Sequence, residues 1–71
     1  MSKSGFVSVK LKNGRNVTAY YTKDCRDVVV QCDDSEFFGS ESIDTTDNSV
    51  EADALWCLKK IITAKGGKID G

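Results

Sequence analysis

Residues 6–22 read FVSVKLKNGRNVTAYYT, two runs of alternating apolar and polar residues separated by Asn13-Gly14. A period of two is the pattern of a β-strand that buries one face. Strands are therefore expected at 6–12 and 16–22, and they should form a hairpin, because Asn-Gly between alternating runs is the strongest short hairpin signal. A third alternating run at 27–32 extends the hairpin into an antiparallel meander.

The register of the two hairpins is predicted by keeping apolar residues together on one face. A three-residue loop at 13–15 places Leu11 opposite Val17, and a four-residue turn at 23–26 places Val28 opposite Tyr21. The inner face then consists of Val7, Val9, Leu11, Val17, Ala19, Tyr21, Val28, Val30 and Cys32.

The last third of the chain supplies the cover that a sheet with one apolar face needs. A helix is expected over about 49–65, with Asn48 as N-cap, Glu51 as its capping-box partner, and Gly66 and Gly67 as the left-handed stop. The predicted fold class is α+β: a three-stranded antiparallel meander (βββα) with one C-terminal helix packed on one sheet face. The apolar positions at helical spacing are Val50, Ala54, Leu55, Leu58, Ile61 and Ile62.

Residues 33–47 form the connection between the third strand and the helix. Phe37 and Phe38 lie near its centre, and adjacent residues of an extended segment point to opposite sides. One phenylalanine is therefore expected to enter the core and the other to face outward, with a short fourth strand around 36–38 as an additional element.

The length of 71 residues predicts one small domain over 1–71, because chains divide into several domains only well beyond this size. The chain has no histidine, the most frequent general base and zinc ligand. No paired-carboxylate or serine-histidine-aspartate arrangement is recognisable either. We therefore expect a non-enzymatic protein with no cofactor and no bound metal.

The cysteines and the absence of a long apolar run predict a cytoplasmic protein. Cys25, Cys32 and Cys57 are odd in number and contain no Cys-x-x-Cys pair, which fits neither a disulfide framework nor a zinc site. No stretch approaches the roughly 18 apolar residues of a membrane span. Cys32 and Cys57 are expected in the core, and Cys25 is expected in an exposed turn.

Charge is distributed very unevenly along the chain, although the formal net charge is only −1. Residues 1–26, 27–58 and 59–71 carry net charges of +5, −9 and +3, and the middle block contains no basic residue. Ordinary surfaces intersperse the two signs, so the middle block is the strongest indication of function. A solvated acidic loop is the alternative interpretation.

This charge pattern predicts a protein-binding inhibitor or modulator that docks an acidic surface on a basic, nucleic-acid-handling partner. In general character only, such a chain resembles the anti-restriction and anti-CRISPR proteins of phages and mobile elements. The predicted partner-binding residues are Asp33, Asp34, Glu36, Phe37, Phe38, Glu41, Asp44, Asp47 and Trp56. Trp56 lies on the helix side opposite the apolar arc, where either the Phe37-Phe38 loop or a partner would cover it.

Two other functions fit the sequence. The outer sheet face would carry aromatic and basic residues that can hold single-stranded nucleic acid, with Lys10, Lys12 and Tyr20 as the candidate contacts. A homodimer that buries the outer face or Trp56 is the third interpretation, because so small a core gains much from additional burial.

Overall fold

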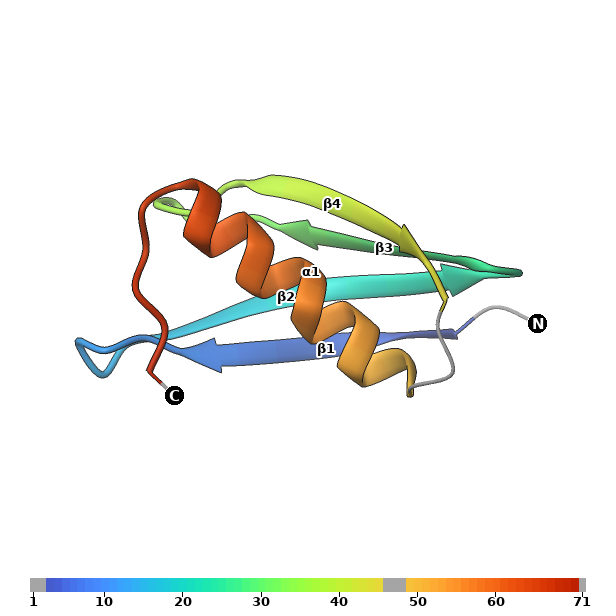
Figure 1. Ribbon diagram of the computed structural model, residues 1–71, viewed down its shortest axis with the longest axis horizontal. Coiled ribbons are helices and arrows are strands. Elements are labelled where there is room, and N and C mark those ends of the chain that lie inside the picture. The colour runs from blue at the N-terminus through green and yellow to red at the C-terminus, as the bar shows by residue number, and fades with distance from the viewer. Residues whose placement is uncertain (1–2, 46–48, 71) are drawn as a thin grey trace.

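The computed structural model describes residues 3–45 and 49–70, and it confirms the predicted α+β fold with a fourth strand added. Four antiparallel strands form one sheet in the order β1-β2-β3-β4, and the helix α1 crosses one of its faces (Figure 1). The elements are β1 (Lys3–Lys10), β2 (Asn16–Asp24), β3 (Asp27–Cys32), β4 (Gly39–Asp44) and α1 (Val50–Ala64).

The core lies between the sheet and α1, and every residue predicted for the inner sheet face is buried there. From the helix, Ala54, Cys57, Leu58, Ile61 and Ile62 close the core, while Val50 and Leu55 are partly buried at its margin. Tyr21 belongs to the same layer, and burial together with the neighbouring Glu51 carboxylate raises the pKa of its hydroxyl.

The β1–β2 hairpin has a loop of the predicted length, but the loop lies one residue earlier than predicted. Leu11 N–H donates to the Arg15 carbonyl, so the loop is 12–14 and Val9 pairs with Val17 instead of with Ala19. The reason is Gly14, whose φ of 89° fits the left-handed position of a three-residue hairpin loop. The predicted loop at 13–15 would have placed Arg15 at that position.

The predicted four-residue turn between β2 and β3 is also wrong, because Asp24 pairs with Asp27 and leaves a two-residue loop. Cys25 opens this loop with a φ of 56°, a conformation that glycine normally supplies. Tyr21 consequently faces Val30 on β3 and Gly5 on β1. Both register errors are two residues, an even number, so the residues of the inner face are unchanged.

The fourth strand occupies 39–44, whereas the sequence placed it around 36–38. Its sequence, GSESID, is rich in residues that strands disfavour, and Ile43 is its one large apolar side chain. Pairing with β3 along its whole length, from Asp27↔Asp44 to Cys32↔Gly39, holds it in the sheet. As predicted, one of the two phenylalanines is buried and the other is exposed, and the structure shows that Phe37 is the buried one.

Helix α1 begins at Val50, one residue later than the predicted N-cap, Asn48, implies. Ser49 is the N-cap, and its side chain accepts a hydrogen bond from the Ala52 N–H at 3.2 Å. The predicted cap Asn48 lies outside the described residues. Serine is as good a capping residue as asparagine, so the sequence did not discriminate between the two.

The C-terminal end of α1 is a Schellman motif, in which Gly67 N–H donates to the Ile62 carbonyl and Gly66 N–H to the Thr63 carbonyl. Of the two glycines in this motif, only Gly66 has a positive φ, 85°. Gly67 has a different requirement, because a Cβ there would lie 2.4 Å from Ile62 Cγ2 and 2.7 Å from the Phe37 ring. The prediction that both glycines supply the left-handed stop is therefore correct for Gly66 only.

The last residues return to the free edge of β1, as Figure 1 shows. Ile69 forms a bridge with Leu11, Lys12 N–H donates to the Lys68 carbonyl, and Asp70 N–H donates to the Lys10 carbonyl. These bonds satisfy part of the β1 edge that would otherwise remain open to pairing with another chain. No helix among the described residues is long and apolar enough to span a membrane.

The glycine pair provides a test of this packing. Gly67→Ala is expected to lower the free energy of unfolding by about 1–3 kcal/mol, because its Cβ would overlap Ile62 and Phe37. Gly66→Ala, whose Cβ would lie in open space, should cost about 1 kcal/mol through its positive φ alone. Urea unfolding of both variants measures the difference, and equal costs would contradict the close packing of Gly67.

The three cysteines should differ in reactivity as they differ in burial. Cys25 is exposed, whereas Cys32 and Cys57 are buried, and burial raises the pKa of the Cys57 thiol. A thiol reagent added to the folded chain is expected to modify Cys25 rapidly and the other two only after unfolding. Mass spectrometry of the modified peptides counts the labelled sites; rapid labelling of Cys57 without denaturant would contradict the burial.

Candidate interaction surface

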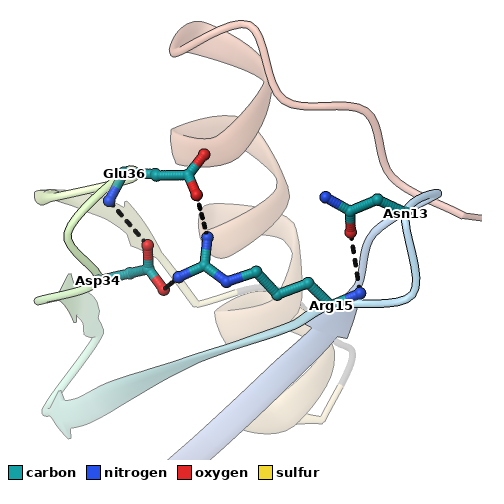
Figure 2. Close-up of polar contacts among 4 residues, drawn as sticks. All are labelled: Asn13, Arg15, Asp34 and Glu36. Atoms are coloured by element: carbon teal, nitrogen blue, oxygen red, sulfur yellow. Dashed lines mark hydrogen bonds and ion pairs between the residues drawn. The ribbon is translucent and has the colours of Figure 1, made fainter.

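Arg15 holds two of the predicted partner-binding carboxylates. Its guanidinium lies between Asp34 and Glu36, 2.6 Å from Asp34 Oδ2 and 2.6 Å from Glu36 Oε1, as Figure 2 shows. Asn13 Oδ1 accepts a hydrogen bond from the Arg15 N–H at 2.8 Å, which fixes the loop that carries the arginine. Asp34 and Glu36 therefore serve first to tie the 33–38 connection to the β1–β2 loop.

Asp34 is also bound by the backbone, because its Oδ1 accepts the Glu36 N–H at 2.8 Å. This hydrogen bond, and after it the pairing with Arg15, hold the pKa of Asp34 below its usual value. Phe37, the next predicted contact residue, is buried against Ile62 and Gly67 and is not available to a partner. Asp34 and Glu36, at the centre of the acidic connection, thus have a structural role. We call their contact with Arg15 the Arg15 joint.

The fold divides the acidic block of the sequence between the two ends of the sheet. Asp27 and Asp33 bracket β3, and about 20 Å separates them at roughly 3.3 Å per strand residue. Glu41 projects toward α1, where Lys60 Nζ lies 4.0 Å from its carboxylate. Asp53, on the first turn of α1, is buried, and the predicted site residue Asp47 lies outside the described residues.

The face of the sheet opposite α1 is uncovered by any described element and carries exposed aromatic rings. Phe6 and Tyr20 pair across β1 and β2, with ring centroids 5.3 Å apart in an edge-on arrangement. Phe6 is 72% exposed and Tyr20 is 39% exposed. Phe38 is 66% exposed and precedes β4, where alternation also directs it to this side. Large exposed apolar groups on one face are typical of interaction sites.

Two shallow depressions join these rings. One, of about 260 Å³, is lined by Phe6, Thr18, Ala19, Tyr20, Gln31 and Asp33. The other, of about 360 Å³, is lined by Gln31, Cys32, Asp33, Phe38, Gly39 and Ser40. Gln31 and Asp33 line both, so the depressions are contiguous and a carboxylate lies where they meet.

A row of three carboxylates crosses the opposite end of the same face. Asp24 pairs with Asp27, and Asp27 pairs with Asp44, so three neighbouring strands place aspartates side by side. Like charges directly opposite in a sheet are destabilising. Within the described chain, none of these three aspartates forms a salt bridge, although Arg26 lies in the adjoining turn.

We call this surface the open face, defined by three aromatic residues and by four aspartates that form no salt bridge with a described residue: Phe6, Tyr20, Phe38, Asp24, Asp27, Asp33 and Asp44. Lys10 is the lysine that the strands direct to the same side. Three of the nine predicted partner-binding residues belong to the open face: Asp33, Phe38 and Asp44. Five others lie elsewhere, namely Asp34, Glu36, Phe37, Glu41 and Trp56, and Asp47 lies outside the described residues.

Trp56 lies on α1, which covers the other side of the sheet, and is 51% exposed. Lys60 Nζ is 5.0 Å from its ring centroid, an arrangement that fits a cation–π contact. The depression beside it is lined by Trp56, Lys59, Lys60, Thr63 and Ala64. The interpretation that the Phe37-Phe38 loop folds over Trp56 is therefore wrong, because Phe37 enters the core instead.

The predicted nucleic-acid contacts are also divided by the fold. Lys10 and Tyr20 lie on the open face, but Lys12 follows the end of β1 and lines a separate depression of about 480 Å³ with Phe37, Lys65 and Lys68. The open face itself carries four aspartates against one lysine. Such a surface repels a polyanion, and it also repels a second copy of itself.

Comparison of the chain with protein-family models, with curated proteins and with solved structures finds no match. In the described residues, no group of three or more His, Cys, Asp or Glu side chains is arranged to hold a metal ion.

Sequence reasoning missed Asp24, Asp27 and Phe6 as members of a binding surface. Phe6 alternates with the inner residues Val7 and Val9, so the signal that directs it to the outer face is present in the sequence. The row of aspartates was not recognisable, because it depends on a register two residues away from the predicted one and on a fourth strand at 39–44.

The Arg15 joint predicts a specific pH dependence. Because the pKa of Asp34 is lowered in the folded state, its contribution to stability is complete above about pH 4, the pKa of an unfolded aspartate, and is lost as the pH falls through the lower folded-state pKa. Asp34→Asn should lower the melting temperature at pH 7 and reduce its decline below about pH 4.

Thermal unfolding between neutral and strongly acidic pH measures this effect. The control is Asp33→Asn, which removes a neighbouring carboxylate that pairs with no described cation and should leave most of the decline in place. An unchanged acid profile in Asp34→Asn would show that the joint contributes nothing.

Proposed function

We propose that this chain is a non-enzymatic binding protein that docks its open face on a protein partner with a basic surface, and that it blocks or redirects that partner by occupying it. The proposal is supported by four aspartates that pair with no described cation and that lie around three exposed aromatic rings. The rings supply apolar contact area, and aromatic residues are enriched among those that dominate binding energy. The aspartates supply charge that favours a cationic surface and disfavours nucleic acid.

The row formed by Asp24, Asp27 and Asp44 is the observation that carries the proposal. Three adjacent strands place these carboxylates next to each other, where their repulsion lowers the stability of the sheet. A small domain has little stability to lose. Retaining an unfavourable arrangement on an uncovered face is typical of a site that performs a function at the expense of stability.

A nucleic-acid-handling protein is the partner class that fits this surface best. Proteins that bind nucleic acid expose basic patches with well-spaced lysines and arginines. A face that combines carboxylates with aromatic rings offers such a patch the same two elements as a nucleic acid, negative charge and ring stacking. The acidic middle block of the sequence led to the same interpretation.

The double variant Asp27→Asn/Asp44→Asn tests the proposal with two readouts of opposite sign. Removing the like-charge pair should raise the free energy of unfolding by about 0.2–1 kcal/mol. The same variant should weaken partner binding about 3- to 10-fold at low salt, because two charges of the contact are lost. A binding loss in a more stable protein cannot result from unfolding.

The experiment is capture from nuclease-treated cytoplasmic extract on the immobilised chain, followed by calorimetry with each purified captured protein. The matched control, Glu41→Gln/Glu51→Gln, removes two charges from the side of the molecule that carries α1 and should bind as the wild type does. Equal binding by both variants, or capture that disappears entirely with nuclease, would refute the proposal.

A further inference from the structure

We propose that the contiguous depressions at Asp33 bind the side chain of an arginine from the basic partner. This inference rests on the proposed function and names the chemical group that the open face recognises. Asp33 lines both depressions, and its carboxylate forms no ion pair with a described residue. Tyr20 lines one depression and Phe38 the other, so an aromatic ring is present on each side of the charge.

The geometry favours arginine over lysine. A guanidinium is planar and weakly hydrated, so it can pair with a carboxylate while it stacks on an aromatic face. An ammonium is a compact, strongly hydrated charge, and in so open a depression it would keep much of its water. Phe38, 66% exposed, presents a largely free ring beside Asp33. Gln31 lines both depressions as well and adds an amide oxygen that can accept a guanidinium N–H.

The chain contains an internal example of the same chemistry next to the site. Arg15 donates to Asp34 and Glu36 at 2.6 Å each, which shows that carboxylates of the 33–38 connection bind a guanidinium in this environment. Asp33 directly precedes this pair, yet strand alternation directs it to the other side of the sheet. Arg15 is already engaged by two acceptors, and no described cation forms a salt bridge with Asp33, so the Asp33 carboxylate is available to a cation of another molecule.

The test is an amide NMR titration of the full chain with two blocked peptides, one alternating serine with arginine and the other serine with lysine. The arginine peptide should shift the resonances of Gln31, Asp33 and Phe38, and its Kd should be about 2- to 5-fold lower than that of the lysine peptide. Asp33→Asn should weaken the arginine peptide about 2- to 5-fold, whereas the control Glu41→Gln should leave it unchanged.

Phe38→Leu separates stacking from simple apolar contact. Leucine retains bulk at the site but has no ring, so the preference for arginine over lysine should disappear while binding of the lysine peptide is retained. Asp33, Phe38 and Glu41 lie at exposed or partly exposed positions outside the core, and the melting temperature of each variant confirms that it folds.

Three outcomes would overturn the inference. Equal affinity for both peptides, with binding that still depends on Asp27 and Asp44, would exclude the arginine site but leave the proposed function intact. Absence of shifts at Gln31, Asp33 and Phe38 would exclude it as well, and the capture experiment would then judge the proposed function separately. Shifts of these residues that depend on protein concentration alone would assign the site to a second copy of the chain.

Discussion

One helix of fifteen residues covers the apolar face of a sheet of four strands, and the rest of the structure depends on this one-sided burial. The domain is too small to cover both faces, so all large aliphatic side chains of the core converge on α1. Leu58, Ile62, Val17, Val28 and Val30 are fully buried at this contact. No element of the described chain covers the other face, and its side chains are available for binding.

The chain also uses electrostatics in two separate ways. At one end of the sheet, Arg15 forms ion pairs with both Asp34 and Glu36 and thereby holds the connection between β3 and β4 against the first hairpin. At the other end, Asp24, Asp27 and Asp44 lie side by side without such a cation among the described residues. Carboxylates that are close in the sequence thus have opposite roles, one structural and one suited to binding. A total charge near zero conceals this division.

The open face and Trp56 lie on opposite sides of the molecule, which has a consequence for binding. A single flat partner cannot contact both, since the core and α1 separate them. The aromatic rings of the open face are accompanied by carboxylates, whereas Trp56 is accompanied by Lys59 and Lys60. The two sides therefore differ in the charge that they would attract, and the open face carries three exposed aromatic rings against the single ring of Trp56.

The sequence by itself determined the inner face of the sheet, and the helix with its approximate ends. It also determined that Phe37 and Phe38 point to opposite sides, one into the core and one outward. Hydrophobic periodicity is a local property, and it survives an even-numbered shift of register because alternate residues keep their side. Tertiary structure alone decided the register, the position of β4 and the partners of the carboxylates. A positive φ at Cys25 and pairing of the polar segment 39–44 with β3 depend on the whole sheet. The acidic residues could be counted from the sequence, but whether a carboxylate meets a cation or another carboxylate depends on which strands become neighbours.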